Sequence, residues 1–431
     1  MSVAQKAAIR TASQISYSDL YQRWEQSNWS AYGIDLSRDR EGWDALSEIQ
    51  RRSALWIYSM FFYGEDSVAD NLSPYIDAAP KEEQKYFLAT QQVDEARHAV
   101  FFHRFFSEVI GSGDSIASTL ASTLPQLGWG YRNVFDRLDR MADSLRKDRS
   151  LPNFARAIAL YHMVVEATLA QPGQHYIEDY FVKSGTLPGF SEGMANISRD
   201  EQRHIGFGVK VLAECFAESE ECREAVAELL REVMPFSLAV FTPPNWDLEY
   251  TRCYGFELED IFAFGMRSVR TKWRAAGYPL EDMPGVFPVD PELPEEEIAR
   301  RQITLMKAGV MGEPNGTPES SPEVQRIYFD LVERVAQTDA VNGDPMTIQW
   351  RFSDAPPWHL RIDNGSTAAA PGEVASPDVS IESSWGDWIR VSTRGERPGR
   401  LLLRRRIRPH GKLRQLAKLP RVFPPRPSKL G

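Results

Sequence analysis

The pentapeptide Asp94-Glu95-Ala96-Arg97-His98 returns 106 residues later as Asp200-Glu201-Gln202-Arg203-His204, so the frame Asp-Glu-x-Arg-His occurs twice in the chain. Two of the seven histidines lie in this frame. Positions i and i+3 of a helix share one face, so each copy points a carboxylate and an imidazole to the same side. One such pair arises by chance on exposed helices, but its repetition indicates two halves of one metal site.

A site for two metal ions in a four-helix bundle needs one further carboxylate from each of the two remaining helices. Glu65, in SMFFYGEDSV, and Glu166, in LYHMVVEATLA, lie in apolar helical stretches, where an unpaired buried charge is costly. Metal ligation removes that cost, and a salt bridge in the core is the alternative. Asp66 is a second candidate beside Glu65, although only one of two adjacent helical residues faces inward well.

The predicted metal ligands are four glutamates and two histidines: Glu65, Glu95, His98, Glu166, Glu201 and His204. These oxygen and nitrogen donors suit two metal ions, Fe/Fe or Mn/Fe, and argue against a thiolate site. Asp94 and Asp200 are expected to accept a hydrogen bond from the histidine of the opposing motif. Arg97 and Arg203 are expected to neutralise the excess of carboxylate. Ion pairs on a helix surface are the alternative for these four residues.

Helical periodicity extends from about residue 39 to residue 308, which predicts an all-α domain at 1–308. The expected helices lie near residues 43–76, 80–110, 127–147, 152–181, 189–217, 222–240 and 257–276. Residues 309–322 have the Gly, Pro and Ser content of a linker. A small α+β domain is predicted at 323–431. Its expected elements are a helix at 323–338, strands at 346–352, 358–363, 379–383, 388–393 and 401–408, and a helix near 412–419.

Composition bounds the protein class. The 431 residues are 42% hydrophobic, have no eighteen-residue apolar run and begin without an apolar secretion signal, so a cytoplasmic protein is expected. The three cysteines form no C-x-x-C pair, which disfavours a disulfide framework. The net charge of −10 is uneven, because residues 391–431 carry thirteen Lys and Arg against one acid. This basic tail predicts either a solvated face or peripheral contact with an anionic membrane. No nucleic-acid partner is predicted.

With the six ligands in order, the first 300 or so residues resemble the ribonucleotide reductase small-subunit superfamily, whose core is a ferritin-like four-helix bundle. The opening region WEQSNWSAYGIDLSRD also agrees with that pattern. The nearer likeness is to the ligand-binding oxidases of this superfamily, which hold a Mn/Fe centre and a long-chain fatty acid. The resemblance implies O2 as a partner and a homodimer. An external electron donor is expected, since no flavin or nicotinamide glycine fingerprint is apparent.

The resemblance assigns roles to three more residues. Ligand-binding oxidases form a valine–tyrosine ether cross-link, and the corresponding positions are Val68 and Tyr161. A valine and a tyrosine in buried helices are also ordinary core residues. Phe102 occupies the position of the radical tyrosine of standard reductases. This excludes only a reductase subunit that uses a tyrosyl radical at this position.

Residues 322–425 resemble a lipid-binding domain of the sterol-carrier-protein type. The likeness rests on the strand pair W-R-F and W-H-L-R-I, on PDVSIESSWGDW with Asp378 before a strand, and on the spacing Gly395-x-x-Pro398. His410-Gly411-Lys412 replaces the usual glycine–aspartate turn before the last helix. Dimerisation or partner docking is the alternative role of this domain.

The sequence therefore predicts an O2-dependent dimetal oxidase or monooxygenase that acts on an apolar, fatty-acyl or lipid-like substrate. One alternative is the radical-generating subunit of a Mn/Fe ribonucleotide reductase. Another is a lipid-binding or metal-storage protein without turnover, in which oxidation of Val68 and Tyr161 is a self-limiting maturation step.

Overall fold

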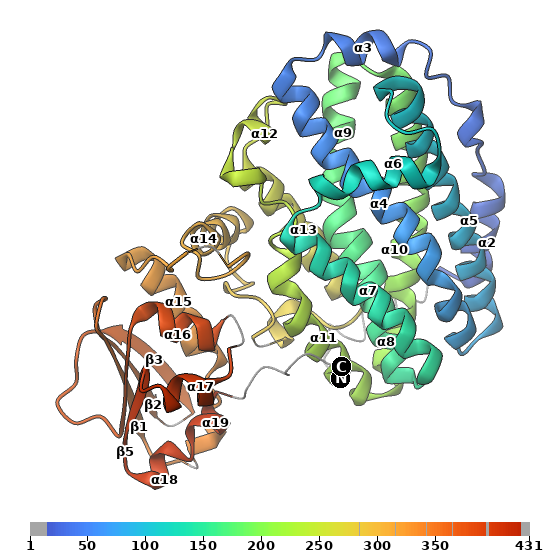
Figure 1. Ribbon diagram of the computed structural model, residues 1–431. Coiled ribbons are helices and arrows are strands. Elements are labelled where there is room, and N and C mark those ends of the chain that lie inside the picture. Colours follow the sequence, from blue (N-terminus) through green and yellow to red (C-terminus); the bar gives the residue numbers. More distant parts are fainter. Residues whose placement is uncertain are drawn as a thin grey trace. The chain divides into compact units, whose positions relative to one another are not determined.

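The computed structural model describes residues 15–283, 285–314, 316–341, 343–363, 365–393 and 396–423. The chain divides into two compact units, Met1–Asp282 and Met283–Gly431. The first is helical and the second combines helices with a sheet, as the sequence predicts (Figure 1). The division falls before the linker predicted at 309–322. Helix α14 (Glu295–Lys307), which the sequence analysis assigned to the first domain, therefore lies in the second unit.

The first unit contains long helices separated by short connections. Its α-helices are α2 (Tyr17–Gln26), α3 (Asp39–Ala45), α4 (Glu48–Ala78), α5 (Glu82–Arg104), α6 (Ile116–Thr123), α7 (Trp129–Lys147), α8 (Leu151–Ile158), α9 (Gln171–Ser184), α10 (Pro188–Glu218), α11 (Glu220–Ser237), α12 (Glu249–Arg252) and α13 (Leu258–Ala275). Two π-helical segments, η2 (Phe105–Ile110) and η4 (Ala159–Ala170), extend α5 and join α8 to α9. The short 3₁₀ segments are η1 (Ala31–Gly33), η3 (Leu124–Gln126), η5 (Pro244–Trp246) and η6 (Leu280–Asp282).

Local sequence explains where the bundle helices begin. Ser47 caps α4 through a capping box with Gln50, so the helix starts at Glu48 and not at Trp43, which lies in α3. Pro188 occupies the first turn of α10, where its missing N–H costs nothing. Helix α2 was not predicted, although Ser16 and Asp19 form a capping box at its start.

Four helical segments form the centre of the first unit: α4, α5, the continuous stretch from α8 through η4 to α9, and α10 (Figure 1). Aromatic side chains fill one end of it, where the rings of Phe105 and Phe190 are 4.4 Å apart. Gly193 of α10 permits this packing, because a Cβ there would lie 2.1 Å from the Phe101 ring. The absence of a side chain thus lets α10 lie close against α5.

The second unit has a five-stranded sheet in the order β3-β2-β1-β4-β5. The strands are β1 (Met346–Phe352), β2 (Trp358–Asp363), β3 (Ser366–Pro371), β4 (Val379–Ser383) and β5 (Ile407–Gly411). Strand β1 pairs antiparallel with β2 and parallel with β4, with Ile348 opposite both Leu360 and Val379. The helices of the second unit are α14, α15 (Pro322–Val335), α16 (Trp385–Ser392), α17 (Pro398–Leu403), α18 (Leu413–Leu416) and α19 (Leu419–Val422), with a 3₁₀ turn η7 (Thr338–Val341).

Two predicted strands of the second unit are wrong. Residues 388–392 belong to α16 and Thr393 caps its end, where Ser384 caps the start of the helix and the buried residues Trp385 and Ile389 follow helical spacing. Most of 401–408 lies in α17 and the turn after it, and only Ile407 and Arg408 enter β5. Strand β3 was missed, because Thr367 is the only β-branched or aromatic residue in its sequence STAAAP.

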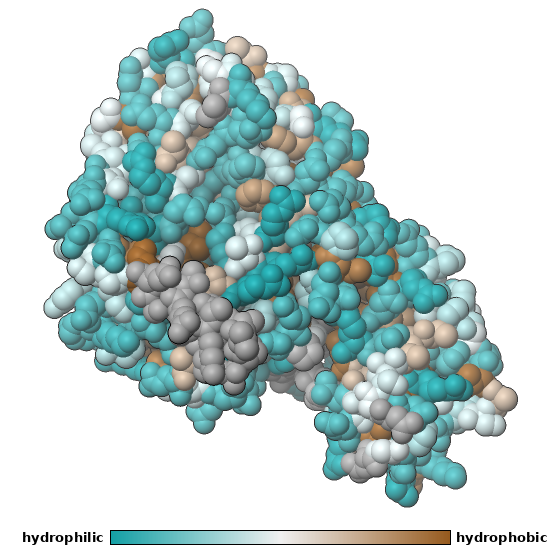
Figure 2. All heavy atoms as spheres, turned by 180° about the vertical axis from the view of Figure 1, so that it is seen from behind, coloured by the Kyte–Doolittle hydropathy of each residue, from teal (hydrophilic) through white to brown (hydrophobic). Residues whose placement is uncertain are grey.

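No helix in the described part of the chain is long and apolar enough to cross a bilayer. The face seen in Figure 2 is mainly hydrophilic, with apolar side chains scattered among polar ones.

Candidate metal centre

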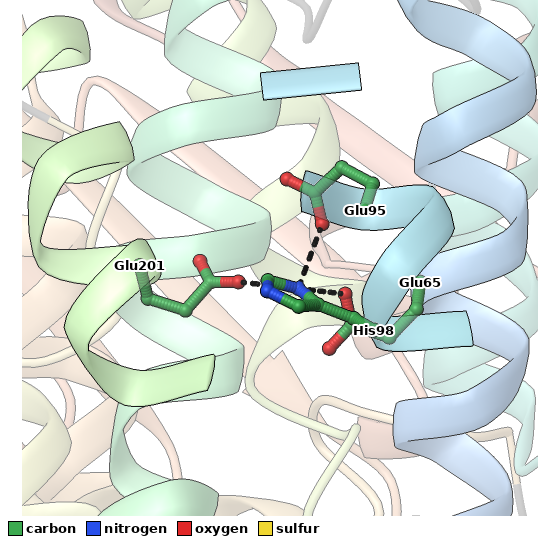
Figure 3. A group of neighbouring side chains, drawn as sticks. All are labelled: Glu65, Glu95, His98 and Glu201. Carbon is green, nitrogen blue, oxygen red and sulfur yellow. Dashed lines mark hydrogen bonds and ion pairs between the residues drawn. The ribbon is translucent and has the colours of Figure 1, made fainter. Parts of the chain in front are cut away.

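The four central segments bring all six predicted ligands together. Glu65 comes from α4, Glu95 and His98 from α5, Glu166 from η4, and Glu201 and His204 from α10, and all six are buried. They form two overlapping groups. The first, Glu65-Glu95-His98-Glu201, is drawn in Figure 3, and the second is Glu95-Glu166-His204. Within each group the ligand atoms lie within 4.8 Å of one another. Asp66, the alternative to Glu65, is in neither group.

Glu95 lies between the two histidines. Its Oε2 is 3.4 Å from Nδ1 of His98, and its Oε1 is 3.1 Å from Nδ1 of His204. Glu65 Oε2 adds a contact of 3.2 Å on the His98 side, and Glu166 Oε1 one of 3.5 Å on the His204 side. The two oxygens of Glu95 thus face different halves of the cluster, and Glu95 belongs to both groups.

The unpaired polar atoms of the cluster show that it fits metal ions. Glu166 Oε2 and Glu201 Oε2 are buried without a hydrogen-bond partner among the described residues. Leaving such atoms unpaired in a protein interior is costly. Two bound cations would satisfy these atoms and balance the four carboxylates. The buried carboxylate and histidine cluster is therefore able to bind two metal ions.

Without cations, the cluster retains protons. Burial raises the pKa of Glu65, Glu166 and Glu201 above the usual range. Burial also disfavours charge on His98 and His204, but the carboxylates of Glu65 and Glu95 outweigh it and hold both histidine pKa values well above normal. Each metal ion must displace protons held here.

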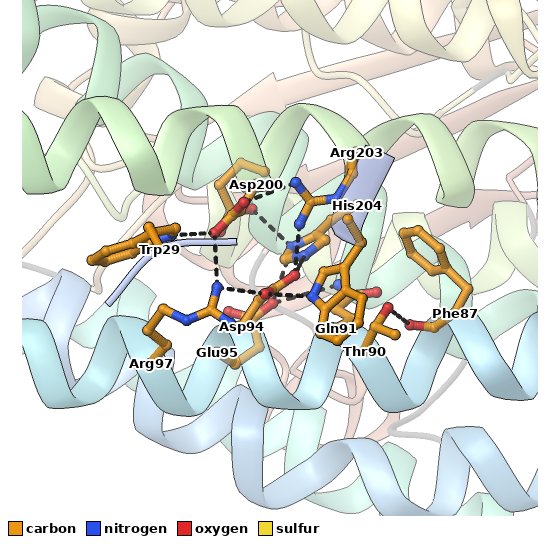
Figure 4. A network of polar contacts seen from close by, with 12 residues as sticks. Trp29, Phe87, Thr90, Gln91, Asp94, Glu95, Arg97, Asp200, Arg203 and His204 are labelled. Carbon is orange, nitrogen blue, oxygen red and sulfur yellow. Dashed lines mark hydrogen bonds and ion pairs between the residues drawn. The ribbon is translucent and has the colours of Figure 1, made fainter. Parts of the chain in front are cut away.

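In each motif, the histidine nitrogen that faces away from the cluster contacts the aspartate of the other motif. Nε2 of His98 lies 3.2 Å from Asp200 Oδ2, and Nε2 of His204 lies 3.2 Å from Asp94 Oδ2 (Figure 4). Each aspartate thus faces the histidine of the other helix, the crossed pairing expected from the duplicated motif. Because Nε2 is held by the aspartate, Nδ1 is the ring nitrogen that faces the cluster.

Two arginines complete this network. Arg203 donates to Asp200 Oδ1 at 2.8 Å and to Asp94 Oδ2 at 2.7 Å, so it joins the two aspartates. Arg97 donates to Asp94 Oδ1 at 2.9 Å and lies 3.7 Å from Asp200. The pKa of Asp200 falls well below normal, because hydrogen bonding to His98 and the nearby positive charges outweigh its burial.

Two tryptophans that sequence reasoning left without a role also contact the aspartates. Trp24 Nε1 donates to Asp94 at 2.9 Å, and Trp29 Nε1 donates to Asp200 at 2.8 Å. The opening region of the chain therefore supplies one indole N–H to each half of the cluster. The sequence WEQSNW contains both residues, but their spacing alone does not identify their partners.

Gln91 and His162 are further residues that sequence reasoning missed. Gln91 Nε2 donates to Glu166 Oε1 at 2.7 Å and to the hydroxyl of Tyr161 at 3.1 Å. The amide oxygen of Gln91 lies 3.0 Å from Nε2 of His162, which donates to it. Burial lowers the pKa of His162 to about 3, so its ring is neutral. Gln91 precedes Glu95 by one helical turn, and that spacing is the signal that could have found it.

The three residues assigned by resemblance lie near the cluster. Tyr161 donates to Glu95 Oε1 at 2.6 Å, and burial raises the pKa of its hydroxyl well above normal. Val68 is buried on α4 and lines the same cavity as Tyr161. Phe102 is fully buried, and its ring stacks on Phe61 at 6.0 Å. The cross-link between Val68 and Tyr161 stays a prediction.

An apolar cavity reaches the cluster. It has a volume of about 560 Å³ with its mouth included. The carboxylates of Glu65, Glu95, Glu166 and Glu201 lie in its wall. The rest of the wall is mainly apolar and includes Met60, Val68, Phe135, Val165, Leu169 and Phe241. The four carboxylates of the cluster thus face a mainly apolar space.

Residues 12–240 match the model of the protein family described as ribonucleotide reductase, small chain. This chain belongs to the ribonucleotide reductase small-chain family. The matched residues include all six members of the metal cluster. The family match covers the bundle.

Solved structures similar to this small-chain family member are R2-like ligand-binding oxidases. A mutant of such an oxidase with an anaerobically reconstituted Mn/Fe cofactor has a TM-score of 0.53 and 23% identity, over 61% of this chain and 93% of that one. The oxidase from Sulfolobus acidocaldarius has a TM-score of 0.50 and 24% identity, over 64% and 93%. At this identity the likeness establishes the ferritin-like fold.

Proposed function

We propose that this small-chain family member is an O2-dependent oxidase with a dinuclear Fe/Fe or Mn/Fe centre that acts on an apolar, lipid-like substrate. The observation that carries the proposal is the apolar cavity whose wall contains the four glutamates of the cluster. A substrate bound there has hydrocarbon on most sides and the metal ligands on one. The Mn/Fe cofactor named for similar oxidase structures supports the mixed-metal choice.

The six residues of the two groups would hold the metals: Glu65, Glu95, His98, Glu166, Glu201 and His204. Bound metals of this kind supply activation of O2. Asp94 and Asp200 keep Nε2 of the opposing histidine protonated and leave Nδ1 free to ligate. Gln91 holds the carboxylate of Glu166 in place. The apolar wall excludes water, which strengthens every electrostatic contact inside the site.

Tyr161 places a hydroxyl group at the junction of the cluster and the cavity. The Tyr161 hydroxyl donates a hydrogen bond to Glu95, so the phenol is held against the carboxylate that lies between the two histidines. Val68 lines the cavity from α4. These positions support oxidation of the pair to an ether in which Val68 and Tyr161 each give up one hydrogen to an O2-derived oxidant. The same chemistry without further turnover would make the protein a lipid-binding metalloprotein.

The second candidate function is radical generation for a Mn/Fe ribonucleotide reductase. Family membership favours it. Phe102 has no oxidisable hydroxyl, so the radical equivalent would reside at the metals. Reconstitution with large reductase subunits tests this role, because nucleotide reduction would replace the oxidase proposal.

The second unit would deliver or sequester the apolar substrate. Its sheet places Asp378 at the start of β4, where the carboxylate accepts a hydrogen bond from the backbone of Thr347 at 2.8 Å. Gly395, part of the lipid-carrier resemblance, lies outside the described residues. The homodimer, the external electron donor and membrane contact through the basic tail stay predictions.

Substitution of one ligand from each of two helices tests the proposal. We expect His204→Ala and Glu166→Ala to lose bound metal and O2 consumption together. His103→Ala is the matched control, because His103 is a half-buried histidine of α5 that contacts Thr119 and lies outside the cluster. Two metals per chain in the His204→Ala protein would refute the ligand assignment. Full metal loading of the wild type with no O2 consumption would refute the oxidase.

A further inference from the structure

A basic and apolar surface lies on the second unit, where α17 turns into β5. It consists of Arg400, Leu402, Leu403, Arg404 and Arg405, and is here called the α17 turn. We propose that the α17 turn binds anionic lipid membranes, with its leucines inserted among the lipids and its arginines paired with the headgroup phosphates. This inference rests on the membrane contact named under the proposed function and assigns residues to it. It does not depend on the oxidase chemistry.

The leucines of α17 differ sharply in exposure. Leu401 is 1% exposed, as is usual for a core leucine, whereas Leu402 is 40% exposed and Leu403 is 89% exposed. Leu401 and the buried Ile407 of β5 already hold this part of the chain in the core, so the two exposed leucines are free to contact another surface. A single exposed leucine is common on proteins. The charges around these two therefore decide what they contact.

The arginines of the α17 turn lack acidic partners. Arg406, the next residue, donates to Asp387 at 2.8 Å, so its charge is balanced within the unit. In the part of the chain that the structure describes, no carboxylate forms an ion pair with Arg400, Arg404 or Arg405. Each of the three is exposed. The turn thus presents three unbalanced positive charges beside two exposed leucines.

Arg405 occupies a backbone position that suits glycine better. Its φ is +52°, in the left-handed region. Its N–H donates to the Leu402 carbonyl at 3.0 Å, and the N–H of Arg406 donates to the Leu401 carbonyl at 2.9 Å. These two bonds define a Schellman cap, in which glycine is the usual left-handed residue because it has no Cβ. An arginine here costs backbone stability, which indicates a role for its charge outside the fold.

The combination of charges and leucines favours lipid over nucleic acid. An anionic bilayer has phosphates at its surface and hydrocarbon directly beneath, so one partner accommodates both the arginines and the leucines. The nucleic-acid backbone offers phosphates alone and would leave Leu402 and Leu403 in water.

The distribution of charge along the chain makes the contact local. The whole chain has a net charge of −10, whereas residues 397–431 contain twelve Lys and Arg and no Asp or Glu. At physiological salt, charges more than about 8 Å apart are largely screened. An anionic membrane therefore attracts the basic segment that contains the α17 turn and not the acidic remainder of the protein.

Co-sedimentation of the full-length, metal-loaded protein with vesicles tests the proposal. One set of vesicles is pure phosphatidylcholine, and the other contains about one third phosphatidylserine, which supplies the anionic surface. We expect much tighter binding to the anionic vesicles, and a marked loss of that binding when the salt is raised from about 0.1 M to about 1 M.

Two variants remove the two parts of the contact separately. Arg405→Gly should weaken binding to anionic vesicles by about fivefold, the usual contribution of one cation near such a surface, while its melting temperature stays the same or rises. The double variant Leu402→Ser/Leu403→Ser should weaken it by more than about tenfold, because the apolar contact is lost.

Two controls are matched to these variants. Arg405→Lys keeps the charge at the same backbone position and should bind like the wild type. Leu124→Ser removes a leucine of the first unit that is 47% exposed, and it should also leave vesicle binding unchanged.

Each outcome supports or overturns the membrane contact. Wild-type protein that binds neither kind of vesicle, or both equally, overturns it, as does unchanged binding by both folded variants of the α17 turn. Tighter binding to a short RNA duplex than to anionic vesicles overturns it in favour of nucleic acid. O2 consumption is measured without vesicles, so loss of vesicle binding leaves the oxidase proposal standing. An inactive protein that binds anionic vesicles refutes the oxidase alone.

Discussion

Gln91 donates a 2.7 Å hydrogen bond to Glu166, which joins α5 to η4 inside the bundle. Nε2 of His162 donates to the amide oxygen of Gln91, so the NH2 group of this amide faces the cluster. Glu166 is the only described residue of η4 in the two ligand groups. The position of this carboxylate thus depends on a residue that is not itself a predicted ligand.

We expect Gln91→Leu to weaken metal binding at the His204 half by roughly tenfold or more, the usual cost of losing a partner that orients a ligand. The His98 half should keep its metal. Metal content after dialysis against a weak chelator measures both. Gln92→Leu is the control, because the Gln92 amide donates to the Ala69 carbonyl and the Ser73 hydroxyl of α4 and makes no hydrogen bond to the described residues of the cluster. Equal loss in both variants would contradict the assigned role.

Asp94→Asn and Asp200→Asn should each damage the metal held by the opposite motif. Asparagine is a weaker acceptor for the imidazole N–H, and loss of such a contact typically costs about 10- to 100-fold in metal affinity. Element-specific spectroscopy of singly loaded protein shows which half is affected. Asp143→Asn, on an exposed Arg146 ion pair, serves as the control and should bind metal normally. Loss confined to the motif that carries the substitution would contradict the crossed arrangement.

A covalent link between Val68 and Tyr161 should form on aerobic metal loading. Its signature is a linked pair of peptides lighter by two hydrogens than their sum, detected by mass spectrometry. The Tyr161→Phe protein should retain its metals but show no link, because it lacks the phenol oxygen. Unlinked peptides in fully loaded, O2-exposed wild type would rule out the cross-link and leave the metal site untouched.

Gly208→Ala should destabilise the fold by roughly 1–3 kcal/mol, the usual cost of overpacking. A Cβ at Gly208 would lie 2.3 Å from Cβ of His162, so α10 and η4 would have to move apart. Gly206→Ala, two residues away, meets nothing within 4 Å and should stabilise the helix by about 0.5–1 kcal/mol. Chemical denaturation measures both, and equal effects would contradict the close approach of the helices.

Metal binding should strengthen as the pH rises. The raised pKa values of Glu65, Glu166 and Glu201 mean that the folded, metal-free protein holds protons that the unfolded chain has released. The stability these protons contribute to the metal-free fold is lost as the pH rises through the raised pKa values. Metal ions replace the protons, so the metal-induced rise in melting temperature should be larger at about pH 7.5 than at about pH 5.5. A smaller rise at the higher pH would contradict this.

The sequence predicts which six residues make up the buried cluster, because they combine a repeated motif with isolated acids in apolar helices. It did not reveal Gln91, His162, Trp24 or Trp29 as partners, since their contacts cross between helices far apart in the chain. The error at 388–393 has a local cause, because a short apolar stretch fits a strand period and a helix period about equally. The capping Ser384 decides in favour of the helix.

The crossed contacts of Asp94 with His204 and of Asp200 with His98 make the two copies of the motif mutually dependent. Neither copy contains a complete half-site. Each copy supplies the histidine of one half of the cluster and the aspartate that contacts the histidine of the other half. A fragment with one copy therefore has an imidazole whose orientation nothing fixes. Metal affinity therefore reports directly whether α5 and α10 are docked in register. A substitution in one copy of the motif damages both halves of the cluster.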